Sequence, residues 1–146
     1  IEKKRRYNLY LFKFWIIIDS MKKRFKRELG QLNDIYRWID VKTENIDSNS
    51  LDDIKLCIEE VFVNLVKYSN CSYIDLFINR IDSLIELTFM DDGVQFDPLA
   101  KENEILSDSL NRSKSGIGLY ILENRMDSLD YQYLNGKNVF TMRKHI

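Results

Sequence analysis

The stretch 84–89 (LIELTF) places apolar side chains at alternate positions and then runs into Asp91-Asp92-Gly93. Such alternation predicts a half-buried β-strand, and the Asp-Gly pair predicts a turn at its end. An acidic side chain at the end of a buried strand is suited to accept a hydrogen bond from an amine on a polar ring, and a nearby glycine lets the backbone approach a ligand closely. An Asp-Asp-Gly turn by itself is more often a plain hairpin, so its interpretation depends on the flanking segments.

Hydrophobic periodicity predicts the remaining elements. Expected helices span about 20–40, 51–68 and 118–127, and expected strands span 73–79, 84–90, 129–134 and 139–143, with a first strand inside 7–18. The last two strands are joined at Asn135-Gly136, a strong hairpin signal. The sum is an α+β protein: a two-layer sandwich with helices on one face of a mixed, mainly antiparallel sheet. The inward-facing strand residues are predicted to be Ile74, Leu76, Ile78, Ile85, Leu87 and Phe89.

Length and composition indicate one soluble domain. The chain has 146 residues, 45% hydrophobic and 31% charged, which is ordinary for a globular protein. A net charge of −1 gives no reason to expect nucleic acid or membrane binding. The apolar stretch 7–18 is too short to span a bilayer, and Cys57 and Cys71 suit reduced thiols. We therefore expect a cytoplasmic protein.

The helix predicted over 51–68 carries Glu60, Asn64 and Lys67 at helical spacing. At 100° per residue these three fall on one stripe, away from the apolar face. A carboxylate can act as a general base, an amide oxygen suits Mg²⁺, and a lysine neutralises phosphate charge. A stripe of this kind is also what any solvated helix face looks like.

Residues 116–119 (GIGL) open the helix that follows the long polar segment 97–115. Backbone N–H groups at a glycine-rich helix start form an anion site. Arg112 and Lys114 precede it and are candidates to reach terminal phosphates, although charged residues in such a segment are more often simply solvated. A lone Gly-x-Gly is weak evidence, but the three segments occur together and in a fixed order.

That order resembles the Bergerat-fold (GHKL) ATP-binding superfamily, and within it the anti-sigma-factor serine/threonine kinases. The matching segments are 60–68 (EVFVNLVKY), 91–98 (DDGVQFDP, with the Phe-Asp-Pro extension of this branch), 115–120 (SGIGLY) and the tail 135–144 (NGKNVFTMRK). The resemblance implies one histidine-kinase-like ATPase domain over 1–146, with an ATP lid at about 97–115.

The resemblance also implies a role for each matching residue. Glu60 is the implied general base, and Asn64 the implied Mg²⁺ ligand, beside Lys67. Asp91 is the implied adenine-reading carboxylate. The remaining nucleotide contacts implied are Gly93, Gly116, Ile117, Gly118, Leu119 and Asn138. The chain departs from the pattern at Gln95, Ser115 and Tyr68, where relatives more often carry glycine, glycine and histidine.

The implied function is an ATP- and Mg²⁺-dependent kinase that sequesters a sigma factor and phosphorylates a Ser/Thr of an antagonist protein. Relatives of this type often form homodimers. Two alternatives stay open: a nucleotide-sensing module without phosphotransfer, and the catalytic domain of a sensor histidine kinase. Sensor kinases usually carry asparagine where this chain has Glu60, and the only histidine, His145, is misplaced as a phosphoacceptor.

Overall fold

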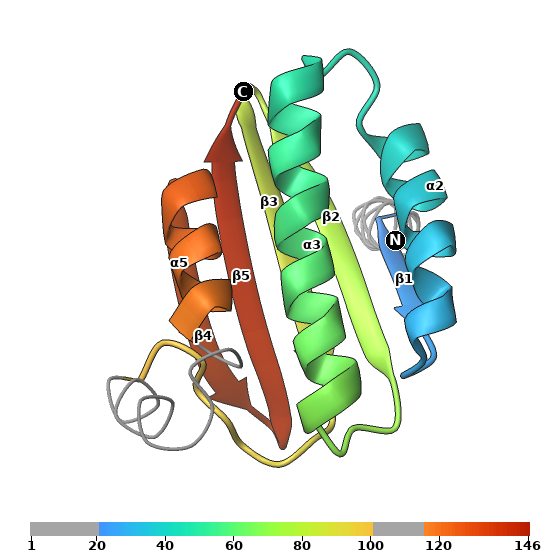
Figure 1. Cartoon of the computed structure of the whole chain (residues 1–146), viewed down its shortest axis with the longest axis vertical. Helices are drawn as coiled ribbons and strands as arrows, with labels where there is room; N and C mark the ends of the chain where they lie inside the picture. Colours follow the sequence, from blue (N-terminus) through green and yellow to red (C-terminus); the bar gives the residue numbers. More distant parts are fainter. Residues whose placement is uncertain (1–20, 101–115) are drawn as a thin grey trace, which may run out of the picture.

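The computed structural model describes residues 21–100 and 116–146, and these form two layers. A five-stranded sheet is covered on one face by helices (Figure 1). The strands are β1 (Lys22–Phe25), β2 (Ile74–Ile81), β3 (Leu84–Asp91), β4 (Ser128–Leu134) and β5 (Lys137–His145). The helices are α2 (Leu32–Lys42), α3 (Ser48–Tyr68) and α5 (Gly116–Arg125), with a 3₁₀ turn η1 (Leu29–Gln31) before α2.

The strand order is β1-β2-β3-β5-β4, and every pairing among the described strands is antiparallel. This confirms the α+β sandwich and its mainly antiparallel sheet. β3 is the central strand, so Asp91 at its end has neighbours on both sides: Ile74 of β2 and Asn138 of β5. The sheet therefore brings the middle and the last part of the chain to the same acidic residue.

The core lies between the sheet and α3. All six strand residues predicted to face inward are buried, as are five residues along α3. The buried residues of α3 are Ile54, Cys57, Ile58, Val61 and Phe62.

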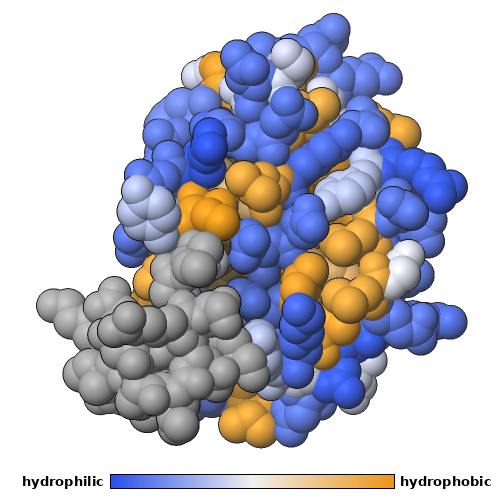
Figure 2. Space-filling view, viewed as in Figure 1, coloured by the Kyte–Doolittle hydropathy of each residue, from blue (hydrophilic) through white to orange (hydrophobic). Residues whose placement is uncertain are grey.

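Asp47 is the N-cap of α3, because its side chain accepts a hydrogen bond from the Ser50 N–H at 2.9 Å. The surface of the molecule on the helical side is mostly hydrophilic, with hydrophobic residues in a few small patches (Figure 2).

The closing hairpin forms where the Asn-Gly pair predicts it. Asn135 and Gly136 have φ angles of 52° and 75°, and they join β4 to β5. Two successive positive φ angles belong to the type I′ turn, whose twist matches that of the flanking strands. The hairpin register then places Asn138 opposite Tyr133 and close to the end of β3.

The helix predicted over 20–40 is wrong in its first part, because residues Lys22–Phe25 form strand β1. Phe25 is buried, and its ring makes two edge-to-face contacts. The ring centroids lie 6.2 Å from Trp38 and 6.5 Å from Phe62. Phe25 was expected on the apolar face of a helix, but it is buried as a residue of β1, a strand at the edge of the sheet. Pairing with β2 decides the conformation, and no local pattern reveals it.

Other boundaries agree with the predictions to within a few residues. α3 begins three positions before the predicted start, and α5 runs over Gly116–Arg125 where 118–127 was expected. The strand expected inside 7–18 and most of the segment 97–115 lie outside the described residues.

Candidate nucleotide site

A cavity of about 660 Å³ opens between the C-terminal half of α3, the end of β3, the start of α5 and the β4–β5 hairpin. This volume is typical of a small-molecule site, as is a largely apolar wall with a few polar groups. The apolar and aromatic lining residues are Val61, Leu65, Tyr68, Phe89, Val94, Phe96, Pro98, Leu119, Leu122, Tyr131 and Phe140. The polar ones are Asn64, Ser69, Asn70, Asp91, Gln95 and Asn138.

Asp91 is the only carboxylate among the described lining residues, and it is 2% exposed. Its Oδ1 accepts from the Gly93 N–H at 2.9 Å, from Asn138 Nδ2 at 3.2 Å and from the Ser69 hydroxyl at 3.5 Å. These three bonds all fall on one oxygen, and no described residue donates to Oδ2. The carboxylate is therefore fixed through one oxygen and keeps the other as an acceptor for a ligand.

Gly93 is required by close approach rather than by its φ angle. A Cβ at this position would lie 2.5 Å from Ser69 Oγ and 2.8 Å from Asp91 Oδ1. Both distances are too short for any side chain, so only glycine lets its own N–H reach the carboxylate. The Asp-x-Gly spacing thus shapes the carboxylate itself.

Asn138 lines the cavity and is 7% exposed, but its amide is engaged by protein groups. Nδ2 donates to Asp91 Oδ1 and to the carbonyls of Gly93 (3.3 Å) and Val94 (3.0 Å). Oδ1 accepts from the Phe96 N–H at 3.0 Å and from the Tyr131 hydroxyl at 2.5 Å. The side chain therefore ties the loop after β3 to the closing hairpin.

The predicted stripe on α3 meets the predicted glycine turn of α5. A Cβ on Gly118 would lie 3.3 Å from both Glu60 Oε2 and Asn64 Nδ2. These contacts bring the carboxylate and the amide to the first turn of α5, which begins at Gly116 and includes Ile117. Helix N–H groups there are available to bind anions. The predicted stripe on α3 and the predicted glycine turn of α5 are therefore neighbours in space.

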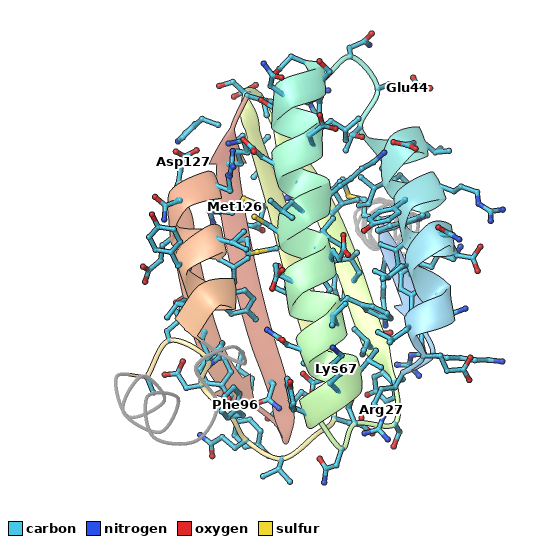
Figure 3. The ribbon with its side chains drawn as sticks, viewed as in Figure 1. Arg27, Glu44, Lys67, Phe96, Met126 and Asp127 are labelled. Carbon is cyan, nitrogen blue, oxygen red and sulfur yellow. The ribbon has the colours of Figure 1, made fainter. Side chains whose placement is uncertain are left out.

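Several predicted residues, Glu60, Lys67, Gly93 and Gly118 among them, do not line the cavity. Glu60 is half-buried beside Gly118, and Lys67 is exposed one helical turn beyond Asn64; neither is among the described lining residues. Lys67 lies at the same end of α3 as the Phe96 loop (Figure 3). Arg112, Lys114 and Ser115 lie outside the described residues, so their predicted roles stay predictions.

Sequence reasoning missed Ser69 and Tyr131. Ser69 ends α3 and touches both Asp91 and the Gly93 position. Tyr131 faces the cavity because the alternation of β4 turns it to the inner side of the sheet, next to Phe140. The sequence held one signal for each: a polar residue directly after the helix for Ser69, and the alternation of 129–134 for Tyr131. Neither signal indicates a site residue until the position of Asn138 is known.

The two cysteines take no part in the site chemistry described above. Both are buried free thiols, and burial raises the pKa of Cys57 to about 12. Within residues 21–100 and 116–146, no three His, Cys, Asp or Glu side chains are grouped as a metal site, and no helix is long and apolar enough to cross a membrane.

Comparison with known proteins identifies the family. Residues 25–144 match the family model described as the histidine kinase-like ATPase domain. A solved structure, the histidine kinase AdeS of Acinetobacter baumannii, aligns with a TM-score of 0.48 at 15% identity, covering 85% of this chain and 66% of that one. No curated protein matches.

The matched range includes all four segments that carry the resemblance, from the stripe on α3 to the closing strand β5. The GHKL superfamily inferred from them is thereby confirmed, while the anti-sigma branch stays a prediction. The chain belongs to the histidine kinase-like ATPase domain family.

Proposed function

We propose that the cavity binds ATP with Mg²⁺, and that the chain transfers the γ-phosphate to a serine or threonine of an antagonist protein. In this proposal it is a regulatory kinase of the anti-sigma-factor type that also binds a sigma factor. The single observation that carries the proposal is Asp91, a buried carboxylate that lines the cavity, is held through Oδ1 and receives no donor from the described residues at Oδ2.

An adenine base suits this acceptor. Its 6-amino group donates a hydrogen bond, and a buried charged acceptor discriminates strongly against a group that cannot donate. The aromatic and aliphatic walls, including Phe89, Phe140 and Leu122, offer apolar surface to a flat ring. The cavity therefore fits a base that is apolar on its faces and a hydrogen-bond donor at one edge.

The phosphates would then extend toward the first turn of α5, which carries Gly116 and Gly118, because the N–H groups at a helix start bind anions. Asn64 would hold Mg²⁺ together with phosphate oxygens, and the ion would neutralise phosphate charge. Lys67 would act on the same charge from the exposed end of the stripe. The contact of Gly118 with Glu60 and Asn64 supports this arrangement because it joins the anion site to both side chains.

Glu60 would be the general base. Its carboxylate would take the proton from a protein serine or threonine as the hydroxyl oxygen bonds to the γ-phosphorus and the bond to the ADP oxygen breaks. Glu60 supports a hydroxyl acceptor because an alcohol must lose its proton during transfer. The resemblance of 91–98 to the anti-sigma branch, with its Phe-Asp-Pro extension, supports the same choice.

The partners and the assembly in this proposal rest on the resemblance. It implies a sigma factor and an antagonist protein as partners and a homodimer as the assembly, while the composition favours the cytoplasm as the location. The alternative of a nucleotide-sensing module shares the same cavity, so it differs only in whether phosphate leaves the bound nucleotide.

Calorimetric titration with ATP and ADP, with and without Mg²⁺, tests the site. Asp91→Asn is the matched variant, because asparagine keeps Oδ1 as an acceptor for its three donors and replaces Oδ2 by a donor that opposes the adenine amine. We expect Mg²⁺-dependent binding in the wild type and binding weaker by about 100-fold or more in the variant. Absence of binding to the intact chain would refute the nucleotide site.

Phosphotransfer separates the kinase from the sensing module. Glu60→Gln keeps the size of the side chain and removes the base, so ATP binding is expected to persist while transfer to a serine-containing partner falls by about 100-fold or more. Wild-type chain that binds ATP tightly yet transfers no phosphate to any candidate antagonist would favour the sensing module.

A further inference from the structure

The five hydrogen bonds of Asn138 exhaust its amide. A primary amide has two N–H donors and one oxygen with two lone pairs. Here the two N–H groups serve three acceptors, and both lone pairs of Oδ1 are filled by Phe96 N–H and the Tyr131 hydroxyl. Although Asn138 borders the cavity, its polar atoms are therefore committed to the protein.

Two one-way partners fix which way the amide points: the Phe96 N–H can only donate to Oδ1, and the Asp91 carboxylate can only accept from Nδ2. With the oxygen so placed, the Tyr131 hydroxyl donates to Oδ1 at 2.5 Å and holds it there. Burial raises the pKa of Tyr131, which keeps the hydroxyl protonated and able to donate. An amide flipped by half a turn would set its N–H against the Phe96 N–H and its carbonyl against the Asp91 carboxylate, so the hydrogen-bond pattern itself selects the orientation.

Three separate parts of the chain then converge on Asp91 Oδ1. Asn138 reaches it from β5, Ser69 from the end of α3, and the Gly93 N–H from the loop that follows β3. Asn138 also holds the Gly93 and Val94 carbonyls, so it restrains the carboxylate and its loop together. A side chain held from three directions presents its second oxygen in one position.

We propose that Asn138, held in place by Tyr131, is a positioning residue that fixes Asp91 for base selection and does not itself bind the base. This inference rests on the proposed nucleotide site and deepens it. A purine with a 6-amino group donates to Oδ2, whereas a 6-oxo purine presents an acceptor to a carboxylate. The preference for a 6-amino purine over a 6-oxo purine depends on how firmly the carboxylate is held. A change that loosens Asn138 therefore lowers this preference.

The test compares ATP with inosine triphosphate, which carries oxygen in place of the 6-amino group. Tyr131→Phe removes only the hydroxyl, and Asn138→Ala removes the amide. Tyr133→Phe is the matched control, since Tyr133 lies on the same strand and is 39% exposed. Dissociation constants are measured by calorimetry, and amide hydrogen exchange of Gly93 and Phe96 is measured by NMR without nucleotide. Exchange at Leu87 in β3 reports whether the fold is intact.

We expect Tyr131→Phe to lower the ratio of ATP to inosine triphosphate affinity by about fivefold, the effect of one neutral hydrogen bond, and Asn138→Ala to lower it further. Gly93 and Phe96 should exchange faster in both variants, with Leu87 unchanged and Tyr133→Phe like the wild type. If Asn138→Ala also speeds exchange at Leu87, Tyr131→Phe decides the outcome.

If the variants bind ATP and inosine triphosphate equally less tightly, and amide exchange at Gly93 is unchanged, the positioning role is overturned. The proposed nucleotide site would not be affected by that result. A wild-type chain that binds neither nucleotide would overturn the proposed function instead. In that case the exchange of Gly93 and Phe96 still decides the positioning role: faster exchange in Tyr131→Phe supports it, and unchanged exchange refutes it.

Discussion

Two buried carboxylates on opposite faces of the sheet have contrasting partners. Asp75 of β2 lies on the face away from α3 and is 1% exposed. Arg24 binds both of its oxygens, at 2.8 and 3.0 Å, and Lys22 Nζ lies 3.4 Å from Oδ2. Asp91 of β3 is buried to the same degree, but its described donors are all neutral and all bind Oδ1.

The contrast shows how burial can serve either structure or binding. A buried charge must be compensated, and two cations compensate Asp75 completely while using both oxygens. Neutral donors stabilise Asp91 without cancelling its charge, so Oδ2 keeps its attraction for an incoming donor. Their similar burial therefore does not distinguish the two residues; the identity of the donors does.

The largest expected effect separates the two carboxylates by paired substitution. Asp91→Asn should weaken ATP binding by about 100-fold or more while changing stability little, because Oδ1 remains an acceptor. Asp75→Asn should leave ATP affinity unchanged and lower the free energy of unfolding by about 1–3 kcal/mol, since Arg24 is more than half exposed and regains water. Urea unfolding and calorimetry on both variants check this. Similar losses of affinity in both would end the distinction.

A smaller effect is expected at the glycine that shapes Asp91. Gly93→Ala pushes a methyl group against Ser69 Oγ and Asp91 Oδ1, so the carboxylate must shift. We expect about tenfold weaker ATP binding and a loss of about 1–3 kcal/mol in stability. Gly30→Ala is the control, because a Cβ there meets nothing within 4 Å. Wild-type affinity in Gly93→Ala would show that Asp91 tolerates displacement.

The smallest effect concerns the neighbouring Asp92 and the acid limb of stability. Burial raises the pKa of Asp92, but hydrogen bonds from Ser72 outweigh it, so the pKa lies below its ordinary value. Its stabilising contribution is complete above the ordinary pKa of about 4 and disappears as pH falls through the lowered folded-state pKa.

Thermal unfolding between about pH 6 and pH 2.5 should therefore show a steeper fall in Tm for the wild type than for Asp92→Asn, below about pH 4. Asp130→Asn, which changes an exposed carboxylate on β4, should keep the wild-type slope. Parallel curves for all three proteins would contradict the role of the Ser72 hydrogen bonds.

Much of the fold follows from local pattern. The alternation over 84–89, the apolar spacing along 51–68 and the Asn135-Gly136 pair each specify an element because the interactions that form it span only a few residues. The same locality explains the failure at 22–25. Whether Phe25 is buried from a helix or from a strand depends on pairing with residues about fifty positions away, and spacing alone does not distinguish them.

The sequence by itself determined which chemical groups are present and in what order: the Glu60–Asn64 stripe, the Asp91-x-Gly93 turn and the glycine pair at 116–118. The tertiary structure alone decided how they are used. It placed Gly118 against the stripe, assigned Asn138 to the protein rather than to open solvent, and gave Asp75 cations but Asp91 neutral donors. The physical reason is that a carboxylate's availability depends on partners contributed by distant strands, and only folding brings those partners together.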